Sequence, residues 1–253
     1  MTEHRDDGTP AHQRYDGGRS ALLRTAIGVG MVVPAAAEGL LTGVLRRDRR
    51  AGVDHFIERW LDTLFLSCGV ELDVDGRQHL WEQRPAVFLF NHKNNFDILV
   101  VAKVVGGKFT SVGKKEAADN PLGAVLGNLV DAVFIDRSDS QSAVDALKPV
   151  EEAIDKGLSL IISPEGTRSR TGEILPFKKG PFRIAMATGV PVVPIVIRNA
   201  EDLGPHSAMV MHPAAVDVRV LPPISTSDWT LKELDRRIAG VRQQFVDTLA
   251  DWH

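Results

Sequence analysis

Short apolar runs alternate with amphipathic segments from residue 71 to the C-terminus. The runs have the length of strands buried on both faces, and they predict strands at 70–74, 86–90, 132–135, 159–162, 192–197 and 216–220. Helical spacing of apolar residues predicts helices at 96–104, 121–126, 142–156, 180–188 and 231–251. A capping-box pattern from Thr230 to Glu233 precedes the last helix. Together these elements indicate an α/β fold with a largely parallel central sheet flanked by helices.

Two further apolar segments lie ahead of this region. Residues 25–45 form the most apolar stretch, although Pro34 and Glu38 interrupt it, and an arginine-rich run follows at Arg46, Arg47, Arg49 and Arg50. Residues 55–66 carry an apolar stripe at helical spacing. An uninterrupted bilayer span needs about 20 apolar residues, and Glu38 would lie deep inside one. The pattern therefore predicts an N-terminal membrane-interacting helical hairpin in the interface, with its arginines at lipid head groups. The alternative is a packed helical subdomain with a solvated charge run.

The chain divides into three expected parts. The first 20 residues are rich in charge, glycine and threonine and lack the apolar core of a signal peptide. We expect a disordered tail at 1–20, a helical membrane-associating segment at 21–68 and one catalytic domain at 69–253. A chain of 253 residues is long enough for such a domain to bury a substantial core.

Composition narrows the class of partner and cofactor. A net charge of −3 and a pI near 6.2 give no basic excess, so we expect no nucleic-acid partner. The single Cys68 excludes an internal disulfide, and the eight histidines show no metal-ligand spacing. We therefore expect an enzyme without a metal or other cofactor, in a reducing compartment.

The candidate chemistry lies in the segment Asn91-His92-Lys93-Asn94-Asn95-Phe96-Asp97. His92 would follow a buried strand, and Asp97 would lie in the first turn of the next helix, where the helix N-terminus favours a carboxylate. Asp97 could then hold His92 in one tautomer and leave the other ring nitrogen free as a general base. The pair would lack a nucleophile of the protein's own. By itself, such a short histidine-to-aspartate interval can also arise by chance.

Three further segments follow at characteristic intervals: Phe134–Arg137, Pro164–Ser169 and Gly189–Ile195. Together with the His92 segment they resemble the four sequence blocks of the PlsC-like 1-acylglycerol-3-phosphate O-acyltransferases, a glycerophospholipid acyltransferase family. The resemblance covers roughly residues 85–200, and it implies that 69–253 is an acyltransferase domain. The chain has Asn94 where the family often has serine, Asp131 where glycine usually opens the second block, and Ser163 where phenylalanine usually precedes Pro-Glu-Gly.

The resemblance implies roles for individual residues. His92 and Asp97 would be the catalytic pair. The acceptor's glycerol phosphate would be bound by residues of the second and third blocks: Arg137, Glu165, Gly166, Thr167 and Arg168. The residue types agree with this, because Gly166 allows a tight turn and an arginine fork suits a phosphate. The alternatives are a strand-end ion pair at Asp136 and Arg137, and a solvated charge run after Pro164.

The resemblance also implies a reaction. A fatty acyl group would pass from acyl-CoA, or from an acyl carrier protein thioester, to the free hydroxyl of lysophosphatidic acid, forming phosphatidic acid in phospholipid biosynthesis. The expected partners are a lysophospholipid acceptor, an acyl thioester donor and a membrane surface, and the protein would be peripheral or monotopic on the cytoplasmic face. We expect the acyl chain in an apolar groove under the proline-rich segment 189–195.

Three other interpretations are compatible with the sequence. The same chemistry could act on another lysophospholipid or on glycerol 3-phosphate. Water could replace the acceptor hydroxyl, which would make the protein a thioester hydrolase. The fold could also serve a non-catalytic lipid-binding or membrane-remodelling protein.

Overall fold

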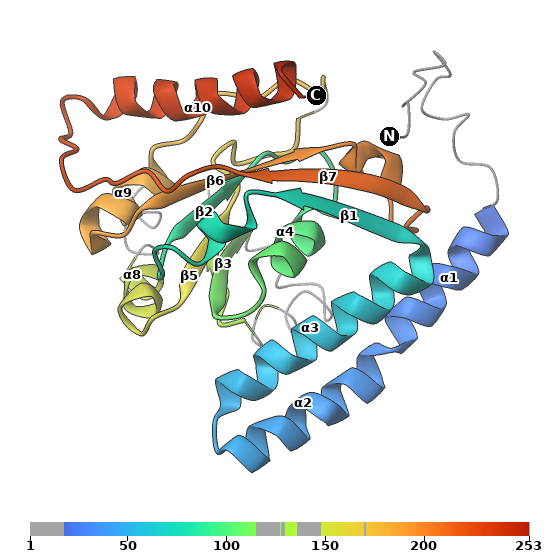
Figure 1. Cartoon of the computed structure of the whole chain (residues 1–253). Coiled ribbons are helices and arrows are strands. Elements are labelled where there is room, and N and C mark those ends of the chain that lie inside the picture. Colours follow the sequence, from blue (N-terminus) through green and yellow to red (C-terminus); the bar gives the residue numbers. More distant parts are fainter. Residues whose placement is uncertain (1–17, 115–126, 128–129, 136–147, 170, 253) are drawn as a thin grey trace.

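The computed structural model describes residues 18–114, 127, 130–135, 148–169 and 171–252 (Figure 1). Its helices are α1 (Gly18–Gly30), α2 (Val32–Arg46), α3 (Arg49–Cys68), α4 (Asp97–Val105), α8 (Lys148–Asp155), α9 (Gly180–Thr188) and α10 (Leu234–Ala250). Two short 3-10 helices, η2 (Arg77–Leu80) and η3 (Ala200–Leu203), accompany them. The strands are β1 (Val70–Asp75), β2 (Val87–Phe90), β3 (Phe109–Lys114), β4 (Val133–Ile135), β5 (Ser159–Ile162), β6 (Val192–Arg198) and β7 (Ala214–Val220).

The seven strands of the described residues form one sheet in the order β1-β7-β6-β2-β5-β3-β4. Neighbouring strands are parallel except for β6 and β7, which run antiparallel with Ile197 opposite Val218. The expected α/β fold with a largely parallel sheet is therefore confirmed.

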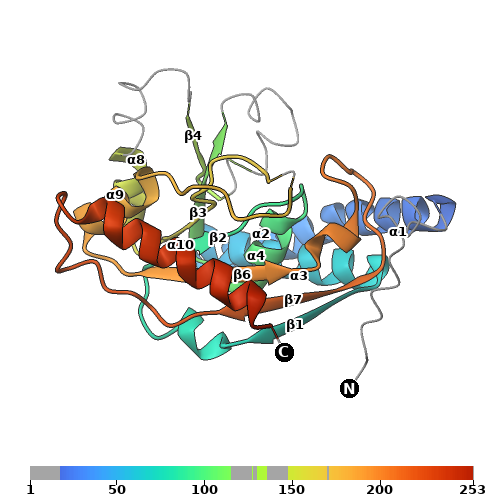
Figure 2. The same ribbon diagram turned by 90° about the horizontal axis from the view of Figure 1, so that it is seen from above.

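Helices cover both faces of the sheet. Figures 1 and 2 place α10 on one side and α3 and α4 on the other. The side chains of β2 alternate accordingly, since Val87 and Leu89 pack among α8, α9 and α10 whereas Phe88 and Phe90 pack among α3 and α4. All four side chains are at most 3% exposed, and this burial on both faces explains why the sequence of β2 is a continuous apolar run.

Most predicted elements are present, with three differences. Strand β3 was not predicted, because Thr110, Ser111 and Gly113 interrupt its apolar pattern. Helix α10 begins at Leu234, and the expected capping box is absent because no side chain caps this helix. The predicted helix at 121–126 and residues 142–147 of the predicted helix at 142–156 lie outside the described residues, as do residues 1–17 of the expected tail. Helix α1 already includes residues 18–20.

The N-terminal segment is a helical hairpin, as predicted. Helices α1 and α2 together span Gly18–Arg46, a bent 29-residue unit long and apolar enough to cross a membrane by length and composition. Helix α3 returns alongside it (Figure 1). The two arms approach closely at glycines, because a Cβ atom on Gly39 would lie only 2.7 Å from the carbonyl oxygen of Gly52. The outer face of the first arm exposes large apolar side chains: Leu22, Leu23, Ile27, Val33, Leu40, Leu41, Val44 and Leu45.

The charged residues of the hairpin are partly paired within the protein. Arg50 donates from Nε to Asp54 at 3.0 Å and from Nη2 to the carbonyl of Phe109 at 2.6 Å, and its side chain is 16% exposed. The expectation that all four arginines of the run face lipid head groups is therefore wrong for Arg50. Glu38 lies 3.0 Å from Arg59 on α3, so the negative charge of this carboxylate is paired with a positive charge within the hairpin.

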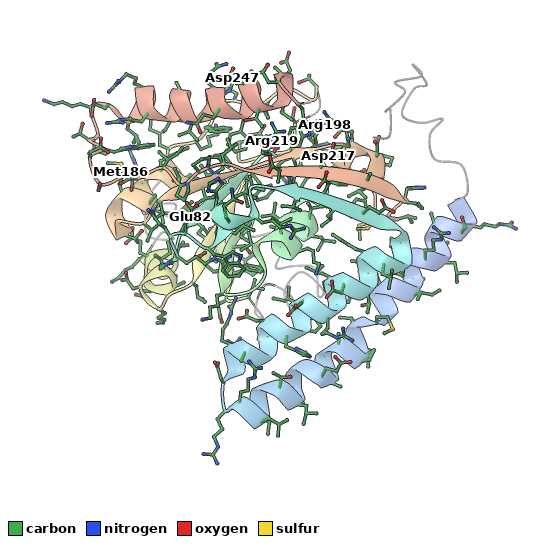
Figure 3. The ribbon with its side chains drawn as sticks, in the orientation of Figure 1. Glu82, Met186, Arg198, Asp217, Arg219 and Asp247 are labelled. Atoms are coloured by element: carbon green, nitrogen blue, oxygen red, sulfur yellow. The ribbon has the colours of Figure 1, made fainter. Side chains whose placement is uncertain are left out.

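The C-terminal end of the chain packs back onto the antiparallel strand pair. Figure 3 shows Arg198, Asp217 and Arg219 gathered on the sheet face beneath the C-terminal end of α10. Arg198 pairs with Asp217 at 3.1 Å, and both arginines lie over the ring of Trp252, at 5.2 and 4.7 Å from its centroid. These contacts hold α10 against β6 and β7.

Candidate active site

Two loops meet at the carboxyl edge of the sheet. His92 follows β2 and the turn at 164–169 follows β5, and these strands are parallel neighbours with Leu89 opposite Ile162. Their carboxyl ends therefore reach the same edge, where ligands bind in open α/β sheets. The two loops are also joined directly, because the backbone N–H of Ser169 donates to the carbonyl of His92 at 2.8 Å.

His92 and Asp97 form the hydrogen-bonded pair that the sequence predicts. His92 Nδ1 lies 2.9 Å from Asp97 Oδ2, and Asp97 is the first residue of α4. Asp97 is 0% exposed, whereas the His92 side chain is 23% exposed. His92 Nε2 has no hydrogen bond among the described residues, and the imidazole lines a cavity. The ring therefore has one nitrogen fixed by a carboxylate and the other available to a bound molecule.

The Asp97 carboxylate also organises the loop that carries His92. Its Oδ2 accepts hydrogen bonds from the backbone N–H groups of Lys93, at 2.5 Å, and Asn94, at 2.9 Å. Its Oδ1 is buried and accepts no hydrogen bond from the described residues. A buried carboxylate in contact with an imidazole favours positive charge on that ring, so Asp97 is suited to stabilise an imidazolium formed at His92.

Glu165 does not lie where a substrate-binding residue should. It is 2% exposed, its Oε1 accepts the backbone N–H of His92 at 2.9 Å, and its Oε2 accepts that of Leu175 at 2.8 Å. Burial raises the pKa of this carboxyl, while the hydrogen bonds from Leu175 and His92 oppose the shift. Because both oxygens are occupied by backbone donors, the expected contact between Glu165 and the acceptor is replaced by a contact that holds the backbone of His92.

The rest of the turn after β5 does reach the cavity. Gly166, Thr167 and Arg168 all line it, and Gly166 has a φ of 71°, in the region that favours glycine. Arg168 donates from Nη1 to Asn95 Oδ1 and to the carbonyl of His206, the latter at 2.8 Å. Sequence reasoning missed Asn95, although it lies two residues before Asp97 in the same motif. Arg137 lies outside the described residues, so its predicted role stays a prediction.

The cavity has a volume of about 790 Å³. Besides polar residues, it is lined by apolar side chains of α3, α4, β3, β4 and β5: Phe56, Ile57, Trp60, Leu61, Ile98, Leu99, Ala102, Phe109, Val112, Phe134, Ile161 and Ile162. None of residues 189–195 is among its lining residues, so this cavity does not lie under the proline-rich segment, and the expected groove there stays a prediction. The pattern could not show this, because the walls come from segments up to about a hundred residues apart in sequence.

The described residues contain no group of three or more histidine, cysteine, aspartate or glutamate side chains that could hold a metal ion. The expectation of a reaction without metal or cofactor stays a prediction.

A histidine oriented by a buried carboxylate, beside an apolar cavity at the carboxyl edge of a parallel sheet, is typical of enzymes that use general-base catalysis on apolar substrates. The family model described as Acyltransferase matches residues 71–198, about half of the chain. The chain belongs to this acyltransferase family, which confirms the resemblance seen in the sequence.

Curated relatives and a solved structure agree with this assignment. The chain is 35% identical over 184 residues to a 1-acyl-sn-glycerol-3-phosphate acyltransferase of Cocos nucifera, covering 72% of this chain and 59% of that protein. It is 34% identical over 189 residues to the protein of the same name from Saccharomyces cerevisiae, covering 74% and 62%. The crystal structure of the 1-acyl-sn-glycerophosphate (LPA) acyltransferase PlsC from Thermotoga maritima superposes with a TM-score of 0.74 and 25% identity, over 92% of this chain and 97% of that one.

The matches to the curated relatives thus cover roughly three-fifths of those proteins' own length, 59% in the first case and 62% in the second. The match to the Thermotoga maritima protein is nearly complete, since it covers 97% of that chain.

Proposed function

We propose that this protein transfers a fatty acyl group from a thioester to the free hydroxyl of lysophosphatidic acid, forming phosphatidic acid in phospholipid biosynthesis. The observation that carries the proposal is the contact between His92 Nδ1 and the buried Asp97, at 2.9 Å, on an apolar cavity that Arg168 also lines. The names of the relatives, all 1-acyl-sn-glycerol-3-phosphate acyltransferases, support the same acceptor.

The proposed chemistry is direct transfer without an acyl-enzyme. His92 Nε2 removes the proton of the acceptor hydroxyl while that oxygen attacks the thioester carbonyl carbon. The tetrahedral intermediate then collapses, the carbon–sulfur bond breaks, and the imidazolium returns its proton to the leaving thiolate. General-base assistance of this kind contributes about 10² to 10⁴ in rate. Asp97 stabilises the imidazolium and keeps Nδ1 as the protonated nitrogen of the resting ring.

Binding of the two substrates follows the polarity of the cavity. The phosphate of the acceptor would be bound by Arg168, with Gly166 and Thr167 in the same turn, and Arg137 is proposed as a further cation for it. An acyl chain would extend from His92 along the apolar walls formed by α3, α4 and β3. Acyl-CoA and acyl carrier protein thioesters present the same reacting group, so either can serve as donor in this mechanism.

The hairpin is the proposed membrane-binding part. Its exposed side chains include Leu40, Leu41 and Leu45, which are 72, 59 and 74% exposed. Contiguous exposed apolar surface of this kind marks membrane or protein contact sites. Since a lysophospholipid acceptor resides in the bilayer, we propose a peripheral or monotopic protein on the cytoplasmic face of the membrane.

A thiol-release assay tests the proposal. The purified protein is given acyl-CoA, or acylated carrier protein, with no acceptor, lysophosphatidic acid, a lysophospholipid with a larger head group, or glycerol 3-phosphate. Release that requires lysophosphatidic acid and yields phosphatidic acid supports the proposal. Equal thiol release without acceptor indicates a thioester hydrolase. Release that requires another acceptor indicates an acyltransferase specific for that acceptor. No release with any acceptor supports a non-catalytic lipid-binding protein.

A further inference from the structure

Asn95 connects the catalytic loop to the arginine of the neighbouring loop. Its Oδ1 accepts a hydrogen bond from Arg168 Nη1, and its Nδ2 donates to the carbonyl of Ala208 at 3.1 Å. The same Nη1 donates to the carbonyl of His206 at 2.8 Å. Asn95 therefore uses both halves of its amide, one on the guanidinium and one on the segment that follows η3.

These contacts occupy one side of the guanidinium. A guanidinium has five N–H donors in a rigid plane, two of them on Nη1. In Arg168 both are accounted for by Asn95 and His206, whereas Nε and Nη2 make no hydrogen bond with the described residues. The Nε–Nη2 edge is the pair of parallel donors that binds a phosphate in bidentate fashion. The arrangement leaves that edge of Arg168, a residue that lines the cavity, for a ligand.

Helix η3 and the segment that follows it, which helps to hold Arg168, are themselves fixed by several contacts. Asn94 Nδ2 donates to the carbonyl of Ala200, and Lys93 pairs with Glu201 at 3.1 Å. A Cβ atom on Gly204 would lie 2.8 Å from Cβ of Ala208, which shows how tightly the turn is folded. The anchoring carbonyls at 206 and 208 thus belong to a segment held against the catalytic loop by direct contacts.

The far end of this segment is bonded to the N-terminal hairpin. The backbone N–H of Met211 donates to Thr25 Oγ1 at 3.0 Å, and that hydroxyl lies 3.3 Å from the carbonyl of Met211. Thr25 is 8% exposed, so the contact is shielded from water. Arg168 is consequently oriented by a framework that reaches from the catalytic loop to α1.

We propose that Asn95 is a positioning residue for acceptor recognition: together with the carbonyl of His206, it holds Arg168 so that the Nε–Nη2 edge is presented to the acceptor phosphate. The proposal rests on the proposed function, and it adds a residue that acts through Arg168. A long side chain such as arginine loses conformational entropy when it binds a ligand. If the side chain is already oriented before binding, part of that cost is avoided. Loss of Asn95 should therefore lower the affinity for the acceptor without altering the general base.

Equilibrium binding separates this role from catalysis. The probe is hexadecyl phosphate in detergent, titrated calorimetrically into the full-length protein, and hexadecanol in the same detergent is the control without a phosphate. Asn95→Ala should weaken binding of the phosphate about three- to tenfold, the effect of one net hydrogen bond. Hexadecanol binding should not change. The Asn95→Asp variant should bind hexadecyl phosphate at least as weakly as the Asn95→Ala variant does, because the new carboxylate competes with the phosphate for Arg168.

A double-mutant cycle assigns the effect to Arg168. If Asn95 acts through this arginine, Asn95→Ala should cost nothing further in a protein that already carries Arg168→Ala. Additive losses in the double variant overturn the proposal, as does parental affinity in Asn95→Ala. If the parent itself binds hexadecyl phosphate no better than hexadecanol, the phosphate site of the proposed function fails, and the inference fails with it.

Kinetics give a second readout that a merely structural role would not produce. With lysophosphatidic acid, Asn95→Ala should raise the acceptor KM about three- to tenfold, leaving kcat, the thioester KM and Tm close to those of the parent. Glu201→Gln is the matched control, because it removes a neighbouring contact between the same two segments that does not involve Arg168. A joint fall of kcat and Tm in Asn95→Ala, or an equal rise of KM in Glu201→Gln, overturns the proposal.

Discussion

Glu165 Oε1 accepts the backbone N–H of His92 at 2.9 Å, so a residue of the loop after β5 holds the main chain of the loop after β2. Its other oxygen accepts the N–H of Leu175 at 2.8 Å. Arg242 of α10 donates from Nε to the carbonyl of Leu175 at 3.1 Å. A continuous chain of hydrogen bonds therefore runs from a helix on one face of the sheet to the backbone of the general base.

The first prediction concerns Glu165→Gln. Glutamine offers one acceptor oxygen, so its amide nitrogen must face one of the two backbone N–H donors. The loop carrying His92 should shift, and kcat should fall about ten- to hundredfold, as expected when a catalytic group is misplaced by an ångström or so. The acceptor KM should change much less. Steady-state kinetics on the purified variant test this, with the exposed Glu173→Gln as control. A selective rise in acceptor KM would show instead that Glu165 binds substrate.

The second prediction follows from the raised pKa of Glu165. Burial raises the pKa of this carboxyl above 4.5, so the folded state binds its proton more tightly than the unfolded state does. The resulting stabilisation is present below the unfolded pKa and is lost as the pH rises through the folded pKa. Relative to Glu165→Gln, which carries no ionisable group there, the parent should therefore lose stability as the pH rises above about 4.5. The measurement is the Tm of both proteins between acid and neutral pH. If the Tm of the parent rose relative to that of Glu165→Gln as the pH increased, the prediction would be wrong.

The third prediction addresses the catalytic pair. His92→Ala should abolish acyl transfer while Tm stays near that of the parent, because a base is removed from a partly exposed position. Asp97→Asn should lower kcat strongly, by as much as about 10⁴, since tautomer control of His92 is lost. Thiol release and thermal melting are measured side by side. A folded His92→Ala protein with near-parental turnover would eliminate the mechanism.

The fourth prediction tests Arg168, the arginine that lines the cavity. A hydrogen bond to a charged group contributes about 1.5 to 3 kcal/mol, so Arg168→Ala should raise the acceptor KM about ten- to hundredfold. The thioester KM should stay near the parental value. Arg183→Ala is the control, since Arg183 is exposed on α9 and does not line the cavity. If Arg168→Ala affected only the thioester donor, the arginine would belong to the donor's phosphates.

The fifth prediction concerns the hairpin. Replacing Leu40, Leu41 and Leu45 with asparagine should reduce co-flotation with anionic liposomes with little change in Tm, because these side chains are exposed. The same replacement at Leu231 and Met209, which are 71 and 73% exposed elsewhere, is the control. Unchanged flotation in the triple variant would favour a packed subdomain. Deleting the first fifty residues is a poorer test, since it removes the Thr25 contact to Met211.

The membrane experiment also has an electrostatic arm. Near an anionic surface each basic residue contributes about 1 kcal/mol, so Arg46→Gln with Arg47→Gln should weaken flotation at low salt and reduce its salt dependence. Arg50 is left unchanged, because its side chain bonds Asp54 and the carbonyl of Phe109.

Local patterns predicted the elements and contacts that depend on neighbouring residues. The apolar run before His92 indicated a buried strand, and the short interval to Asp97 allowed the observed hydrogen bond. Strand β3 was missed, because its place between β5 and β4 depends on long-range pairing rather than on its own interrupted pattern. The role of Glu165 was also beyond local reasoning. Its partners, His92 and Leu175, are 73 and 10 residues away, and no spacing rule brings them together.

Helix α3 contacts both the first arm of the hairpin and the cavity, since Gly52 packs on α2 while four residues form a wall of the cavity: Phe56, Ile57, Trp60 and Leu61. With α1 and α2 resting on the bilayer as proposed, lipid and cavity are separated by little more than the thickness of this two-helix layer. A chain of about sixteen carbons would lose on the order of 13 kcal/mol in passing through water, at roughly 0.8 kcal/mol per methylene. A sideways route past α3 would avoid that passage through water. On such a route the acceptor would arrive by lateral diffusion in two dimensions, and its surface density in the membrane, rather than its concentration in solution, would set the rate of supply.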